Sequence, residues 1–139
     1  MFLMISLFIY FAQGAEELST ALQACSIMAS VITDYTEMMD INQRVKDWKA
    51  TCLKSKGNCL VLSDYAITKA KIKNASCIIH YDYPQKKSHF GRRMSCLLDT
   101  IRANEGKEKP KPLYCQIFIT EKNNGVRYCT GLVKLLKRY

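Results

Sequence analysis

The chain has 139 residues, of which 48% are hydrophobic and only three are proline, so its composition excludes a largely disordered protein. The formal net charge is +9, and the first basic residue is Arg44. An acidic beginning and a basic remainder favour anionic partners, because a positive surface attracts them over a long range.

The first fifteen residues form an uncharged apolar run that ends in small side chains. The run is shorter than the roughly 20 residues of a membrane-spanning helix, but it suits the core of a signal peptide. Ala12 and Gly14 have the small side chains that a signal peptidase reads, so we expect cleavage after Gly14 or Ala15. No Lys or Arg precedes the run, which is unusual for an export signal. The sequence predicts a signal peptide over 1–15 and a single domain over 16–139, secreted or periplasmic.

Seven cysteines follow this predicted leader: Cys25, Cys52, Cys59, Cys77, Cys96, Cys115 and Cys129. In an oxidising compartment they would form up to three disulfides and leave one thiol over. No two of them have C-x-x-C spacing, and neither histidine is spaced with them as a zinc ligand usually is. We therefore expect disulfides, no metal and no cofactor.

Two helices are predicted in the first third of the domain. Apolar residues recur at helical spacing over 16–38. Asp40 and Gln43 form an Asp variant of the capping box, which places a second helix over 41–55. A turn near Asp40 would join the two helices as an antiparallel hairpin.

The register of this hairpin bears on the disulfides. Cys25 and Cys52 would lie at similar heights on the two helices, within one helical turn of each other. Both would face inward, so a bridge between Cys25 and Cys52 is the preferred first disulfide. The remaining pairings stay open.

After Gly57 the helical period gives way to shorter β-rich runs. Segment 65–72 is ambiguous: on a strand, Lys69, Lys71 and Lys73 would line one solvent-exposed face, whereas Ser63 could also cap a short helix. Residues 77–83 alternate as a clearer strand, which Pro84 ends.

The last third is predicted to be mostly strands. Segment 94–101 fits a helix or a strand, and its place among strands favours a strand. A charged loop over 104–112 precedes a strand over 113–120. The Asn-Asn-Gly sequence at 123–125 then predicts a hairpin, with a return strand over 126–130. Together the segments predict an α+β fold: an N-terminal helical hairpin packed on an antiparallel sheet of about four strands, stabilised by disulfides.

A basic loop is predicted between these strands, over 85–93. Its candidate binding residues are Lys86, Lys87, Phe90, Arg92 and Arg93. Cations interleaved with an aromatic ring suit an acidic protein, a nucleic acid or an anionic glycan. The alternative is that such lysines only keep a sheet edge soluble.

Catalysis has one candidate pair, His80 and His89, which could serve as acid and base in a small nuclease-like hydrolase. The sequence contains no phosphate-binding loop, G-x-S-x-G or H-E-x-x-H motif. The favoured prediction is therefore a basic, exported binding protein of the inhibitor, immunity or envelope-adaptor type. It would act on an acidic protein partner, without catalysis and without a transmembrane segment in the mature chain. The secreted nuclease is the alternative.

Overall fold

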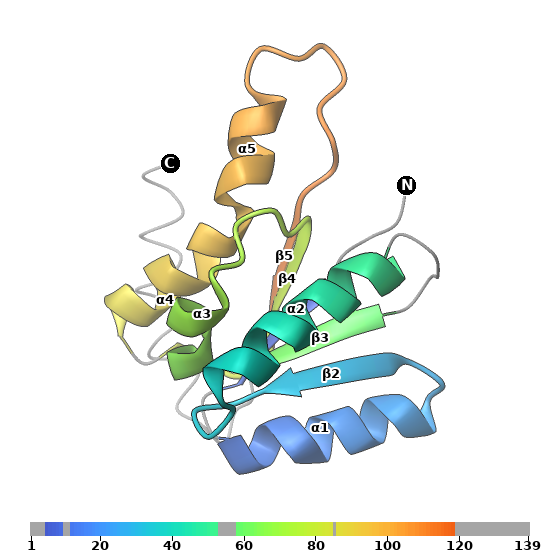
Figure 1. The fold of residues 1–139 in the computed structure, drawn as a ribbon. Coiled ribbons are helices and arrows are strands. Elements are labelled where there is room, and N and C mark those ends of the chain that lie inside the picture. Colours follow the sequence, from blue (N-terminus) through green and yellow to red (C-terminus); the bar gives the residue numbers. More distant parts are fainter. Residues whose placement is uncertain (1–4, 10–11, 53–57, 85, 119–139) are drawn as a thin grey trace.

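Strands and helices alternate along the chain in the computed structural model, which describes residues 5–9, 12–52, 58–84 and 86–118. The elements are β1 (Ile5–Ile9), α1 (Ala12–Ala24), β2 (Met28–Ile32), α2 (Met38–Cys52), β3 (Asn58–Ser63), α3 (Asp64–Ala70), β4 (Cys77–His80), α4 (Lys87–Met94), the 3-10 helix η1 (Ser95–Leu97), α5 (Leu98–Asn104) and β5 (Tyr114–Ile117). The five strands form one sheet in the order β2-β3-β1-β4-β5, and every neighbouring pair is parallel (Figure 1). The protein is an α/β domain, and the predicted α+β fold with an antiparallel sheet is wrong.

Helices cover both faces of the sheet, because each crossover between parallel strands carries one. On β3, Leu60 and Leu62 belong to a core shared with α2 and α3, whereas Cys59 and Val61 pack with Ala15 of α1. All six residues of β3 are buried. A strand covered on both faces shows no alternation of apolar and polar residues. The alternation that marks a strand with one solvent-exposed face is therefore missing from β3.

The apolar run at the start of the chain supplies the middle strand of the sheet. β1 pairs with β3, where Ile5 lies opposite Cys59, and also with β4, where Ile5 lies opposite Cys77. A short apolar run suits a buried strand as well as a signal peptide, and periodicity alone does not separate the two. Cleavage after Gly14 or Ala15 would remove this central strand. The described part of the chain gives no support to export, and the compartment stays a prediction that no observation tests.

The predicted helical hairpin is replaced by a helix, a strand and a second helix. α1 ends at Ala24, and Ser26 turns the chain with a φ of 61° before β2 begins. The apolar residues of β2 happen to continue the helical spacing of α1, which is why one long helix was predicted over 16–38. α2 does cover most of the predicted second helix and buries Ile41 and Trp48. Because β2 separates α1 from α2, the register that would have joined Cys25 to Cys52 does not exist.

The six cysteines among the described residues are all free, so the predicted disulfide framework is wrong there. Cys25 is exposed and Cys52 is buried. Burial, with a smaller contribution from Cys52, raises the pKa of Cys59 to about 11, and burial raises that of Cys96 to about 12. These thiols stay protonated and unreactive near neutral pH. Cys129 lies outside the described residues.

Segment 64–70 forms α3, and the reading of Ser63 as a helix cap is confirmed. Ser63 has extended backbone angles, and its Oγ accepts a hydrogen bond from the backbone N–H of Ala66 at 3.3 Å. The helix ends at Lys71, which takes the left-handed conformation with a φ of 48°. The three alternating lysines therefore do not line one face of a strand.

The predicted basic loop and the strand after it are both helical, as α4, η1 and α5. Of the two structures considered for segment 94–101, the helix is correct. The strand was preferred because the segment lies between predicted strands, but the connection between two parallel strands usually contains a helix. β5 falls within the predicted strand over 113–120. The hairpin at 123–125 and its return strand lie outside the described residues. Of the helices that the structure describes, none is both long and apolar enough to cross a membrane.

Candidate nucleic-acid interface

Acidic residues follow three of the five strands at one edge of the sheet. Asp34, Asp64 and Asp82 come shortly after the ends of β2, β3 and β4. Because all five strands are parallel, their carboxyl ends meet along this edge. In open α/β sheets this is the edge where ligands bind.

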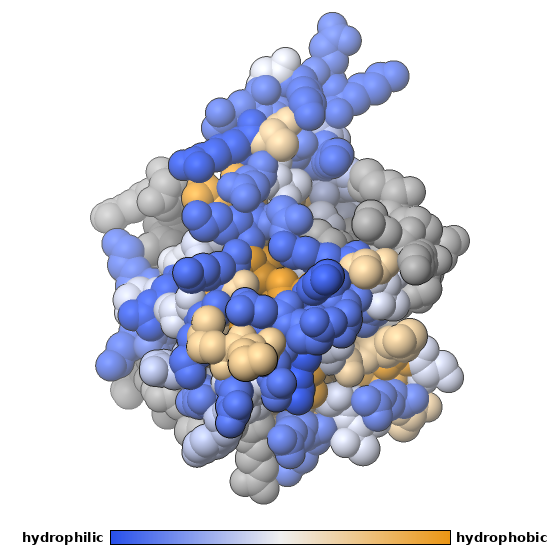
Figure 2. Space-filling view, viewed as in Figure 1, coloured by the Kyte–Doolittle hydropathy of each residue, from blue (hydrophilic) through white to orange (hydrophobic). Residues whose placement is uncertain are grey.

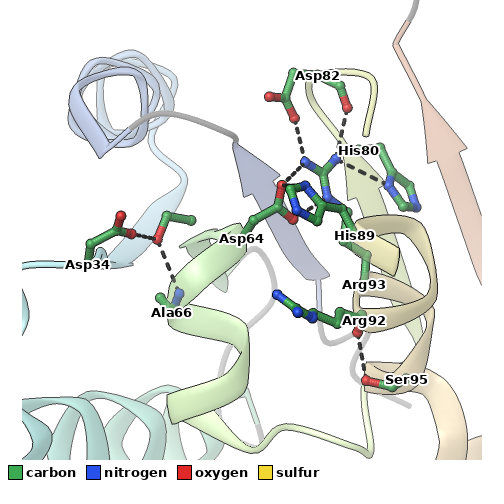
Figure 3. A network of polar contacts seen from close by, with 10 residues as sticks. Asp34, Asp64, Ala66, His80, Asp82, His89, Arg92, Arg93 and Ser95 are labelled. Carbon is green, nitrogen blue, oxygen red and sulfur yellow. Dashed lines mark hydrogen bonds and ion pairs between the residues drawn. The ribbon is translucent and has the colours of Figure 1, made fainter. Parts of the chain in front are cut away.

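Arg93 of α4 is fully buried and binds two of these carboxylates (Figure 3). Its Nε and Nη2 donate to the two oxygens of Asp64, each at 2.7 Å. Nη2 also donates to Asp82 Oδ1 at 3.0 Å, and Nη1 donates to the backbone carbonyl of Asp82 at 2.9 Å. The paired contact with Asp64 is the strong, planar geometry that a guanidinium and a carboxylate make. Arg93 thus ties α4 to the ends of β3 and β4.

The charge of Arg93 is compensated inside the protein. Burial by itself would lower the pKa of Arg93, but the hydrogen bonds and charges of Asp64 and Asp82 outweigh it, and the pKa is raised. Removing one partner from such a buried pair typically costs about 3–5 kcal/mol, because the other charge remains buried and unpaired. Arg93 therefore holds the edge of the sheet together and does not reach a ligand.

His80 belongs to the same buried cluster. Burial first, and the charge of Arg93 second, lower the pKa of His80 to about 4, although Asp64 opposes the shift. Arg93 Nη1 lies 3.5 Å from His80 Nδ1, and since an arginine only donates, Nδ1 accepts and the imidazole is neutral at pH 7. The other face of the cluster is closed by Phe90, whose ring stacks on His80 with centroids 5.5 Å apart.

The two predicted catalytic histidines do not face a cleft together. His80 has no exposed surface, and His89 Nδ1 lies 3.4 Å from the Oδ2 atom of Asp64. Both side chains surround the Arg93 network, and a fully buried imidazole cannot reach a substrate. This geometry gives no support to the acid and base pair of a nuclease.

The five predicted binding residues separate into two groups. Lys86, Lys87 and Arg92 are exposed, whereas Phe90 is partly buried and Arg93 is fully buried. Only the exposed three are available to a partner. One feature of the sequence could have indicated that an arginine is buried here. Asp64 and Asp82 each follow a strand, and carboxylates that come together at the edge of a sheet favour a cation between them.

An open groove with a volume of about 560 Å³ lies between α3 and α4. Its lining residues are Ile67, Thr68, Lys71, Ile72, Lys73, Arg92 and Ser95. Ile67 and Ile72 are buried and form an apolar floor, and none of the lining residues is acidic. Arg92 extends from α4 towards α3 (Figure 3). The sequence reading missed Lys71 and Lys73, because it placed them on the solvent-exposed face of a strand.

A second pocket, of about 370 Å³, lies where β2 ends and has the opposite character. Glu16, Glu37 and Asp40 contribute three carboxylates to its lining, against one guanidinium from Arg44. Arg44 is moreover engaged with the protein, donating from Nη1 to the backbone carbonyl of Val31 at 2.6 Å. The described residues contain no cluster of three or more side chains suited to hold a metal ion. The face that carries α2, α3 and α4 is mostly hydrophilic in Figure 2. Of the two pockets described above, the groove beside Arg92 is the one that suits an anion.

Two known structures with a similar arrangement of strands and helices are domains of a DEAD-box protein and of an ATPase. The C-terminal domain of the DEAD-box protein Dbp5 superimposes with a TM-score of 0.72 at 13% sequence identity, covering 100% of this chain and 73% of that one. The fold resembles that of RecA-like helicase C-terminal domains. The C-terminal part of the Fun30 ATPase domain matches with a TM-score of 0.65 at 16% identity, covering 86% of this chain and 35% of that one.

One similarity is visible in the sequence itself. The human protein named "Putative ATP-dependent RNA helicase TDRD12" is 24% identical over 104 residues, which cover 73% of this chain. The chain spans 9% of that protein's length. No protein-family model matches the chain. These likenesses are to helicase and ATPase domains, and they overturn the prediction of a small exported inhibitor, immunity protein or adaptor as well as the nuclease alternative.

Proposed function

We propose that the chain is an RNA-binding domain of the helicase type, which holds the sugar-phosphate backbone in the groove between α3 and α4. The observation that carries this proposal is the groove itself, where Lys71, Lys73 and Arg92 meet and no lining residue is acidic. The fold, shared with helicase C-terminal domains, and the likeness to a human protein named as an RNA helicase support it.

The lining suits phosphate for electrostatic and for geometric reasons. Lysine and arginine bind phosphate oxygens through charge-assisted hydrogen bonds, and binding releases the counterions of the polyanion. Thr68 and Ser95 add hydroxyl groups of the kind that contact phosphates in nucleic-acid complexes. The carboxylates of Asp64 and Asp82 both bind Arg93, whose positive charge offsets part of their negative charge, so they repel a phosphate less than two unpaired carboxylates would.

The proposed activity is binding alone. The 139 residues contain no phosphate-binding loop sequence, so we assign RNA binding to them and not ATP hydrolysis. Of the partners that the basic composition suggested, nucleic acid is the one that the comparisons support. An acidic protein partner is not favoured.

The test measures binding of a short, fluorescently labelled single-stranded RNA by anisotropy at several salt concentrations. The groove variant replaces three cations by glutamate: Lys71, Lys73 and Arg92. The control variant makes the same charge change in the exposed segment between α5 and β5: Lys107, Lys109 and Lys111. We expect the groove variant to lose at least about tenfold in affinity and roughly 2 units of the slope of log K against log salt, at about 0.7 per contact. An equal loss in the two variants would show that overall charge alone binds RNA, and a parent chain that binds no RNA would overturn the proposed function.

A further inference from the structure

An exposed tyrosine lies next to the groove. Tyr65, in the first turn of α3, has 56% of its surface exposed. Thr68, which lines the groove, lies three residues further on, and residues with this spacing are neighbours on a helix surface. Thr68 Oγ1 also donates to the backbone carbonyl of Tyr65 at 2.9 Å. Tyr65 is therefore a neighbour, on the surface of α3, of one residue that lines the groove.

The ring of Tyr65 is held in place by Lys69. The Nζ of Lys69 lies 4.7 Å from the ring centroid, a cation–π contact that covers one face of the ring. Lys69 Nζ also donates to the backbone carbonyl of Asp34 at 3.4 Å, which anchors the lysine to the end of β2. Since Asp64, the preceding residue, is bound by Arg93, the backbone that carries Tyr65 is fixed as well.

We propose that Tyr65, positioned by Lys69, stacks against an unpaired RNA base whose phosphates lie in the adjacent groove. This inference rests on the proposed function and adds the class of RNA that the site selects. In a duplex both faces of a base are covered by its neighbours, whereas in a single strand a face is free to stack on an aromatic ring. Every base has such a face, so the site selects single-stranded RNA with little preference for sequence.

The other exposed aromatic residues at this edge of the sheet fit the role less well. Tyr35 lines the acidic pocket at the end of β2, where carboxylates repel a phosphate backbone. Tyr81 and Phe118 pack edge to face against each other, with centroids 6.3 Å apart. Among these four rings, Tyr65 combines exposure, a bound cation and the cationic groove beside it.

The experiment compares two probes on the full chain: a labelled single-stranded RNA, and a strand of the same length that lacks bases but keeps every phosphate. Tyr65→Ala removes the ring, and Tyr65→Phe keeps it without the hydroxyl. Tyr114→Ala removes a similarly exposed tyrosine (50% exposed) from β5 as the matched control. Circular dichroism checks that each variant is folded.

We expect Tyr65→Ala to weaken binding of the normal strand roughly tenfold, within the range for one stacked base, and to leave the abasic strand unaffected. Tyr65→Phe and Tyr114→Ala should bind like the parent. If Tyr65→Ala binds the normal strand like the parent while the groove variant still loses affinity, the stacking proposal is wrong and RNA binding at the groove stands. If Tyr65→Ala weakens both strands equally, the tyrosine supports the fold of the site and does not stack. Failure of the parent to bind either strand would instead overturn the proposed function.

Discussion

Arg92 and Arg93 are neighbours on α4, and the structure gives them opposite roles. Arg93 has no exposed surface and donates to Asp64 and Asp82, so its charge is used inside the protein. Arg92 is exposed and lines a groove that has no carboxylate in its lining. The difference shows that a basic residue is available to a ligand only where the fold has not already paired it. In this chain, the carboxylates that follow the strands decide which arginine that is.

The largest expected effect is on folding stability, from Arg93→Met. This change leaves Asp64 buried without its cation, so the free energy of unfolding should fall by about 3–5 kcal/mol. The chain has a single tryptophan, Trp48, which is buried and reports unfolding in urea by its fluorescence. A midpoint unchanged from the parent would show that the buried pair does not hold the edge of the sheet.

The same cluster should make stability depend on pH. The pKa of His80 is about 4 in the folded protein, and its value without burial, as in the unfolded chain, is 6.5. Between pH 6.5 and pH 4 the unfolded chain therefore binds a proton at His80 that the folded chain does not bind. The contribution is complete above pH 6.5, and stability falls as the pH is lowered towards 4, by roughly 3 kcal/mol in all. His80→Phe removes this titration.

The measurement is the free energy of unfolding in urea from pH 7 to pH 5, a range in which few carboxylates titrate. The slope should be clearly smaller in His80→Phe than in the parent, whatever the difference in absolute stability. Equal slopes in the two proteins would mean that His80 is protonated in the folded state, contrary to the burial observed.

Much of the local structure follows from the sequence, because it depends on short-range patterns. The second helix predicted over 41–55 overlaps most of α2, and Ser63 has the side chain that caps α3. The alternation over 77–83 locates β4. Each of these features is set by neighbours along the chain, which a single sequence displays.

The arrangement of the strands does not follow from those patterns. β1 and β2 are short apolar runs that also fit a signal peptide and the continuation of a helix, and only their pairing with β3 makes them strands. The basic residues of the groove come from the segment that follows α3 and from α4, so the site exists only once the crossovers are in place. Arg93 was included among the predicted binding residues because it is an arginine in the same basic segment as Arg92. The sequence of that segment does not show which of the two side chains is buried.

A smaller effect on stability is expected from Ser63→Ala, at the junction between β3 and α3. Ser63 Oγ accepts from the Ala66 N–H and donates to Asp34 Oδ1, so it caps α3 and links that helix to the end of β2. Losing a cap of this kind costs about 1 kcal/mol. Urea unfolding measures the loss, with Ser88→Ala at an exposed position of α4 as the control. A loss no larger than that of the control would mean that α3 does not depend on its cap.

The smallest effect on stability should come from Arg92→Met, which tests the comparison from the other side. An exposed residue that the fold does not pair can be replaced within about 0.5 kcal/mol, so the urea midpoint should stay near that of the parent. Binding of single-stranded RNA should nevertheless weaken several-fold, and the slope of log K against log salt should fall by about 0.7, as expected for the loss of one phosphate contact. Both quantities are measured on the same preparation, by Trp48 fluorescence in urea and by anisotropy with labelled RNA. Reduced stability with unchanged RNA affinity would contradict the role proposed for Arg92. Arg92 would then stabilise the fold, and only two cations of the groove would be left to bind RNA.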